Sequence, residues 1–270
     1  MRRLLAALVL VAAAGGALFL IDPPYEAFEI RSRVLDEERT ILEHLPVGYE
    51  TSGRSYPVLF LLDANPRASA FGPLFYDIAE RVSVLGAPVP EMIVLGVTNT
   101  NRLRDMIPVP DTTFPPAPGR ASDFLRFISE ELIPEVEARY RTTELRVLYG
   151  GSDAGLFALY AMTAAPDAFR AVIASSPSLG RCPDFMADRV RGVFRERPAL
   201  SGTLFLVYGA EEGPSVVARV PEFASLIEQS RSESFILGVM RVPGAGHVPG
   251  SGLEEGLRFI FGAPTAEPGR

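Results

Sequence analysis

Hydrophobic positions follow two repeating patterns along this chain. Six short segments are apolar almost throughout, which is typical of strands buried on both faces of a parallel sheet. These segments are YPVLFLLD (56–63), EMIVLGV (91–97), LRVLYG (145–150), AVIASS (171–176), TLFLVYG (203–209) and FILGVMRV (235–242). Two earlier segments, AFEIRSRVL (27–35) and RTILEHLPV (39–47), alternate between apolar and polar residues. Alternation predicts strands with one buried face and favours an antiparallel pair.

Helical periodicity fills the intervals between the buried strands. The expected helices cover residues 68–85, 121–140, 153–163, 184–197, 216–229 and 253–261. Strands that alternate with helices are joined by crossovers into a mostly parallel sheet, here of eight strands, with helices on both faces. Such a sheet binds its ligands at the carboxyl ends of its strands. We therefore expect one α/β domain over residues 22–262, followed by a flexible tail over residues 263–270.

The first residues form a different kind of segment. Two arginines precede an unbroken apolar stretch from Leu4 to Ile21, which an aspartate and two prolines follow. This pattern predicts a signal peptide or an N-terminal membrane anchor over residues 1–21. The small residues Ala12–Ala14 favour cleavage, which would make the mature protein periplasmic or secreted. If the segment is retained, it would contact a membrane.

Composition narrows the chemistry. The formal net charge is −7, and no cluster of basic residues is present, so nucleic acid is not an expected partner. All 26 basic side chains are arginines, which excludes every mechanism that needs a lysine. Cys182 is the single cysteine and can form neither an internal disulfide nor a metal cluster. We expect no cofactor and no metal, a small-molecule substrate, and leave the oligomeric state open.

A serine stands where a buried strand gives way to a helical pattern. The frame Gly150-Gly151-Ser152-Asp153-Ala154 resembles the G-x-S-x-G turn that raises a nucleophile, with alanine at its last position. Small residues are needed on either side of the serine because strand and helix pass close together there. The alternative is that Ser152 only caps the helix, since serine is a preferred N-cap. We expect Ser152 to be the nucleophile.

A base and an acid are expected at later strand ends. His247 follows the last strand in a glycine-rich loop and is the candidate base, whereas His44 lies within an alternating strand and is more typical of a structural histidine. The loop GAEEG offers Glu211 and Glu212 as the acid that would orient the histidine. Glu212, three residues past Gly209, is favoured, and Glu211 remains the alternative.

An oxyanion needs two backbone N–H donors, one of them from the residue after the nucleophile. That residue is Asp153, whose negative side chain is unusual beside a developing anion. The second donor should come from the loop after LFLLD, at Ala64 or Asn65, and we favour Asn65.

Taken together, several segments resemble the putative-esterase family of α/β-hydrolases. They are YPVLFLLDAN, NRLRDMIPVP, FISEELIPEVEARYRT, GGSDAGLFALYAMTAAPDAFRAVIASSPSL, LVYGAEEG and the final GH, and they span nearly the whole mature chain. That family includes siderophore esterases, S-formylglutathione hydrolases, feruloyl esterases and mycolyltransferases. The resemblance implies an α/β-hydrolase fold and an ester hydrolase with a Ser-His-Glu triad.

The resemblance also assigns pocket residues and shows departures. Arg104 and Asp105 match an arginine–acid pair of the family and are expected to support the pocket; the alternative is an exposed ion pair of little energetic value. After SPSL this chain has Gly180-Arg181 where siderophore-esterase relatives carry bulky aromatics, which argues against a catecholate siderophore. The segment from Gly180 to Thr203 is too short for a large lid domain. Acyl transfer on the same triad, and a non-catalytic binding protein on the same scaffold, are the competing hypotheses.

Overall fold

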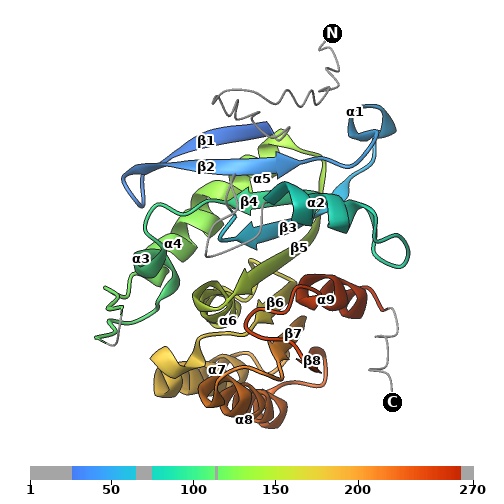
Figure 1. Ribbon diagram of the computed structural model, residues 1–270. Coiled ribbons are helices and arrows are strands. Elements are labelled where there is room, and N and C mark those ends of the chain that lie inside the picture. The colour runs from blue at the N-terminus through green and yellow to red at the C-terminus, as the bar shows by residue number, and fades with distance from the viewer. Residues whose placement is uncertain (1–25, 65–74, 113–114, 263–270) are drawn as a thin grey trace, which may run out of the picture.

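The computed structural model describes residues 26–64, 75–112 and 115–262, and an eight-stranded sheet runs through this part of the chain. Its order is β1-β2-β4-β3-β5-β6-β7-β8, from top to bottom in Figure 1. β2 pairs antiparallel with β1 and β4, and all remaining neighbours are parallel. The strands are β1 (Glu26–Ser32), β2 (Glu37–His44), β3 (Tyr56–Leu62), β4 (Ile93–Val97), β5 (Thr142–Gly151), β6 (Ala171–Ser175), β7 (Gly202–Gly209) and β8 (Phe235–Val242).

Helices cover both faces of the sheet. In chain order they are α1 (Tyr49–Ser52), α2 (Phe75–Ser83), α3 (Arg102–Met106), α4 (Ala121–Arg126), the π-helical segment η1 (Phe127–Leu132), α5 (Ile133–Arg139), α6 (Asp153–Ala164), the short 3₁₀ turn η2 (Leu179–Arg181), α7 (Pro183–Glu196), α8 (Pro214–Ser230) and α9 (Gly252–Ile260). The prediction of a mostly parallel eight-stranded α/β fold is confirmed.

Two hydrophobic clusters correspond to the two faces of the sheet. Along β3, Phe60 belongs to the cluster under α4 to α8, whereas its neighbours Leu59 and Leu61 belong to the cluster under α2 and α9. Successive side chains of a strand point to opposite faces, so a continuous apolar run serves both layers. This is why the buried strands were recognisable as unbroken hydrophobic segments.

Some local structure differs from the sequence expectation. Residues 121–139 form one helical run as predicted, but its middle is π-helical, and Ile133 N–H donates to Ile128 O, five residues back. Pro134 follows at once and has no N–H to donate, which fits a local change in the helical hydrogen-bond pattern. The five-residue helix α3 was not predicted, because five residues are too few for a helical period to be visible.

The predicted signal or anchor segment lies outside the described residues, as do the tail 263–270 and part of the predicted helix 68–85. None of the helices in the described part of the chain is long and apolar enough to cross a membrane.

Candidate active site

Ser152 stands on a strained turn between β5 and α6. Its backbone has φ 59° and ψ −121°, a region that residues with a Cβ rarely adopt. The hydroxyl makes no capping hydrogen bond to the helix. The alternative that Ser152 serves as a side-chain helix cap is therefore wrong.

The turn is tight because strand and helix almost touch. A Cβ on Gly150 would lie 2.2 Å from Ala154 O, a distance that no side chain tolerates. Ala154, by contrast, is fully buried and its methyl group is accommodated. Alanine at the last position of the G-x-S-x-G frame is thus compatible with the turn, whereas a side chain at Gly150 is not.

The loop after β6 fixes the turn from the neighbouring strand. Ser152 N–H donates to Ser175 O at 2.9 Å, and Ser178 N–H donates to Ser152 O at 3.1 Å. Ser178 Oγ also lies 3.3 Å from Ser152 Oγ, within hydrogen-bond distance. Both the backbone and the hydroxyl of Ser152 are therefore positioned by the segment that follows β6.

His247 and Glu212 form a close pair at the same edge of the sheet. His247 Nδ1 lies 2.6 Å from Glu212 Oε2, with the glutamate side chain 2% exposed and the histidine side chain 52% exposed. The other carboxylate oxygen of Glu212 accepts hydrogen bonds from Gly209 N at 2.7 Å and from Ser176 Oγ at 2.5 Å. Glu211 is exposed, and its backbone N–H donates to Ala245 O in the loop that carries His247.

Ser176 connects the acid with the histidine loop. Its hydroxyl donates to Glu212 and accepts from Val248 N at 3.0 Å. The Val248 side chain in turn packs over Gly151, with Cγ1 3.0 Å from the position that a Cβ there would take. These contacts bring the loops after β5, β6, β7 and β8 together. No hydrogen bond joins Ser152 to His247 in the part of the chain that the structure describes.

Backbone strain is concentrated in this region. Of the five described non-glycine residues with positive φ, four lie in loops that follow strands at the carboxyl edge, and one lies in the β1–β2 turn. The four are Asp63 (56°), Ser152 (59°), Ser176 (46°) and Val248 (54°). Residues in such conformations cost about 1–3 kcal/mol each and gather at functional sites. The concentration of strained residues therefore supports this edge of the sheet as the candidate site, independently of side-chain chemistry.

Asp153 is buried between two arginines. Its Oδ2 accepts from Arg102 Nη1 at 2.7 Å, and its Oδ1 accepts from Arg181 Nε at 2.9 Å. Arg102 also donates to both oxygens of Asp63, and Arg181 Nη1 donates to Asp111 at 2.6 Å. The proline-rich segment 106–120 is thereby attached to the turn, because Asp111 belongs to it. Residues 113–114 lie outside the described part.

The amides predicted to hold an oxyanion differ in their availability. The N–H of Asp153 has no acceptor among the described residues, as expected at the first residue of a helix. The N–H of Ala64 donates to Val97 O at 3.3 Å, so this amide is already engaged. Asn65, the favoured second donor, lies outside the described residues.

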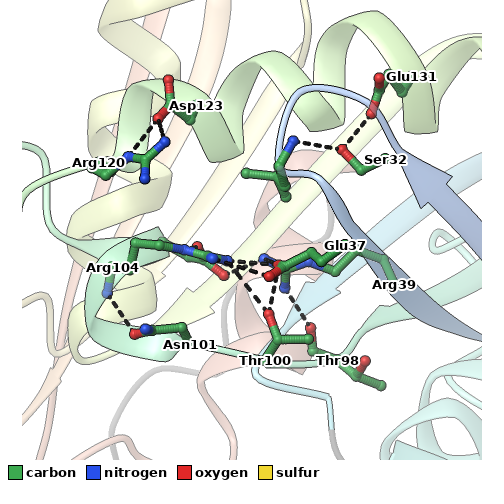
Figure 2. A network of polar contacts seen from close by, with 12 residues as sticks. Ser32, Glu37, Arg39, Thr98, Thr100, Asn101, Arg104, Arg120, Asp123 and Glu131 are labelled. Atoms are coloured by element: carbon green, nitrogen blue, oxygen red, sulfur yellow. Dashed lines mark hydrogen bonds and ion pairs between the residues drawn. The ribbon is translucent and has the colours of Figure 1, made fainter.

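Asp105 is buried and Arg104 is partly buried, so neither is an exposed surface residue. Asp105 is 1% exposed and bonds both Arg104 and the fully buried Arg39, while Arg104 donates twice to Glu37, at 2.6 and 3.0 Å. Figure 2 shows Glu37, Arg39 and Arg104 gathered in this network. The alternative of an exposed ion pair is wrong. The network attaches α3 to β2, and the first residue of α3 is Arg102, which reaches Asp153.

The network strongly stabilises the charged form of one carboxyl group. Hydrogen bonds from Arg104, together with Thr100 and the charge of Arg39, lower the pKa of Glu37 to about 2, although partial burial opposes the shift. The same bonds raise the pKa of Arg104. Glu37 and Arg104 therefore both remain ionised at neutral pH.

The remaining candidate groups do not join the site. The ring of His44 packs at 6.5 Å from Tyr76, and burial lowers the pKa of this histidine. Cys182 is a buried free thiol whose pKa burial raises to about 11. Within the described ranges, no three His, Cys, Asp or Glu side chains are grouped so as to hold a metal ion.

A family model described as "Putative esterase" matches residues 32–230, which is most of the chain. The chain belongs to this esterase family. Among curated proteins, it is 36% identical over 146 residues to the ferri-bacillibactin esterase BesA of Bacillus subtilis, a match that covers 46% of this chain and 48% of that protein. It is 42% identical over 138 residues to the siderophore triacetylfusarinine C esterase of Aspergillus fumigatus, a match that covers 48% of this chain and 47% of that protein. The chain thus spans about half the length of these curated relatives.

Solved structures extend the similarity over more of this esterase-family chain. An IroE-like serine hydrolase from Shewanella oneidensis superposes with a TM-score of 0.76 at 27% identity, over 88% of this chain and 80% of that one. The BES protein of Bacillus cereus gives a TM-score of 0.76 at 22% identity, over 93% and 98%. These likenesses confirm the α/β-hydrolase fold that the sequence resemblance implied.

Several residues of the site were not anticipated from sequence. Arg102, Arg181 and Ser176 carry no motif, and each acts through partners that are distant in the chain. A partial signal existed for two of them: Arg102 lies in NRLRDMIPVP and Ser176 in the segment that ends in SSPSL, both of which carry the family resemblance, whereas Arg181 stands at a departure from the family. What was missing was the pairing of these arginines with Asp153.

The buried network makes stability depend on pH in a defined direction. Because the pKa of Glu37 falls from 4.5 to about 2 on folding, its carboxylate stabilises the fold fully above pH 4.5, and this contribution is lost as the pH falls toward 2. We expect Glu37→Gln to lower the free energy of unfolding at pH 7, and the gap from the wild type to narrow between pH 5 and pH 3. Urea unfolding at several pH values measures this. Glu38→Gln, on the exposed face of the same strand, is the matched control, and a gap that does not change with pH contradicts the prediction.

Proposed function

We propose that this protein is an exported serine esterase that cleaves a carboxylic ester through an acyl-enzyme on Ser152. The observation that carries the proposal is the pair of His247 Nδ1 and Glu212 Oε2, 2.6 Å apart, in loops that pack against the strained Ser152 turn. Membership of an esterase family supports the reaction class. The chain order of serine, acid and histidine is that of α/β-hydrolases.

Each residue has a role in the proposed mechanism. Ser152 Oγ attacks the ester carbonyl while His247 Nε2 takes its proton, and the imidazolium then protonates the departing alcohol. Glu212, held by three hydrogen bonds, keeps the Nδ1–H tautomer oriented and stabilises the imidazolium. Water activated by His247 releases the acid. Hydrogen bonds between nucleophile and base are often long in a free enzyme and shorten when substrate binds.

The backbone of Asp153 and Asn65 would hold the oxyanion. The Asp153 N–H points from the first turn of α6, where the helix N-terminus also favours negative charge. Arg104 and Asp105 are proposed to support the pocket indirectly, because they attach α3 to the sheet and α3 carries Arg102.

Siderophore esters are the substrate class that we propose first. Two relatives are named as esterases of ferri-bacillibactin and triacetylfusarinine C, and a third, from Emericella nidulans and 33% identical over 147 residues, as an enterobactin esterase. The chain has no tryptophan, and Gly180-Arg181 replace the bulky aromatics expected after SPSL. A siderophore with aliphatic arms therefore fits better than a catecholate.

Export is proposed from the N-terminal pattern alone. Residues 1–21 carry two arginines and an apolar stretch typical of a signal peptide, and cleavage would release the mature enzyme outside the cytoplasm. If the segment is retained, it would tether the enzyme to a membrane.

Ser152 provides the decisive test of the activity. Ser152→Ala is expected to lower kcat on 4-nitrophenyl butyrate by at least ~1000-fold, because the nucleophile is lost while the fold remains. A fluorophosphonate probe should label the wild type and not the variant. Ser178→Ala, which removes the neighbouring hydroxyl, should remain labelled. Undiminished turnover in pure Ser152→Ala protein would show that the activity resides elsewhere.

The two adjacent glutamates provide a matched test of the acid. Glu212→Ala is expected to lower kcat by about 100-fold or more, because His247 loses the group that fixes its tautomer. Glu211→Ala should stay within about twofold of the wild type, since its side chain is exposed. Steady-state kinetics of both variants on one ester decide between them. Equal losses would contradict the prediction, and a larger loss for Glu211→Ala would reverse the assignment.

A further inference from the structure

Asp153 brings a negative charge to the place where the proposed reaction develops another. Its amide follows the nucleophile directly, and its carboxylate is on a residue that is only 6% exposed. Two negative charges close together in a poorly solvated site repel each other strongly. An oxyanion held by this amide would therefore be disfavoured unless the carboxylate were neutralised.

The structure supplies one guanidinium to each carboxylate oxygen. Arg102 approaches Oδ2 from α3, and Arg181 approaches Oδ1 from η2, at 2.7 and 2.9 Å. All three side chains are largely buried, with 16%, 14% and 8% of their surface exposed for Arg102, Arg181 and Asp153. Pairs this close and this buried interact far more strongly than surface pairs.

Both arginines are held from their far sides by further acids. Asp63, which has a positive φ, accepts hydrogen bonds from two nitrogens of Arg102. Asp111 accepts a hydrogen bond from Arg181 Nη1. Arg181 also donates to Pro115 O at 3.2 Å. Burial alone would lower the pKa of Arg102 and of Arg181, but the facing carboxylates outweigh it and raise the pKa of both. The two guanidinium groups are thus fixed in place and permanently charged.

We propose that Arg102 and Arg181 are positioning residues that neutralise the Asp153 carboxylate, so that the Asp153 amide can hold an oxyanion. Arg181 also bonds Asp111 and the carbonyl oxygen of Pro115, two described residues of the proline-rich segment. The proposal rests on the proposed esterase function and explains how this chain accommodates an acid directly after its nucleophile.

Rescue by a second substitution separates this electrostatic role from a purely structural one. Arg181→Gln should lower kcat on 4-nitrophenyl butyrate about tenfold or more with KM within about twofold, because Asp153 keeps only Arg102 as a partner and its less compensated charge opposes the transition state. Adding Asp153→Asn should restore most of that loss, since the asparagine keeps the backbone N–H and carries no charge. If the bridge only holds segments together, the double variant will be as slow as Arg181→Gln or slower. That result would overturn the proposal.

Arg181→Lys and a variant of a surface ion pair serve as controls. The lysine keeps the charge and loses the planar fork, so its kcat should lie between those of the wild type and Arg181→Gln. Arg197 and Asp167 form a two-bond pair on the surface, at 2.7 and 2.8 Å, and Arg197→Gln should leave kcat unchanged. Thermal unfolding checks that each variant is folded. Should Arg181→Gln not fold, Arg102→Gln with and without Asp153→Asn makes the same comparison at the other oxygen.

Ser152→Ala distinguishes failure of this inference from failure of the proposed function. If Ser152→Ala hydrolyses the ester as fast as the wild type, the esterase proposal is wrong, and so is the proposed role of the two arginines. If Ser152→Ala abolishes hydrolysis but Asp153→Asn fails to rescue Arg181→Gln, only the electrostatic role is wrong.

Discussion

The close crossing of β5 and α6 is the constraint on which the site depends. Ala154 O of α6 lies only 2.2 Å from where a Cβ on Gly150 of β5 would be, and the turn between the two elements places Ser152 in a strained conformation. Such strain persists when surrounding contacts over-determine it. Here Ser175, at the end of β6, and Ser178, in the loop that follows, form hydrogen bonds with the backbone of Ser152, and these bonds offset the strain.

Charged side chains near the Ser152 turn form two largely buried networks, and α3 contributes residues to both. On one side, Arg104 and Asp105 join Glu37 and Arg39 of β2; on the other, Arg102 joins Asp63 and Asp153. Buried ion pairs gain little net stability, because desolvation offsets their attraction, but removing one partner is costly. Their clearest consequence is positional: a five-residue helix is held between the sheet and the turn. A chain whose basic residues are all arginine can use planar, two-pronged contacts throughout these networks.

The proposed base and acid depend on a separate set of contacts. Glu212 is almost fully buried and triply hydrogen-bonded, whereas His247 is half exposed in a loop that Val248 and Ser176 anchor. The carboxylate is thus held by its hydrogen bonds, while part of the imidazole remains accessible to solvent. Ser176, which bonds both the acid and the histidine loop, is the residue through which β6 and β8 are coupled.

Much of this protein was determined by its sequence alone. The buried strands and most helices follow from local periodicity, and the candidate residues Ser152, Glu212 and His247 follow from their places after strand ends. Each of these signals lies within a few neighbouring residues of the chain. The strand order, the choice of the buried Glu212 beside the histidine and the pairing of Asp153 with Arg102 and Arg181 were decided by tertiary structure. Each joins residues that are dozens of positions apart, and no local pattern records which distant arginine will neutralise a given acid. Asp153, which in the sequence was an unexplained charge beside the nucleophile, acquires its partners only when α3 and η2 fold against the turn.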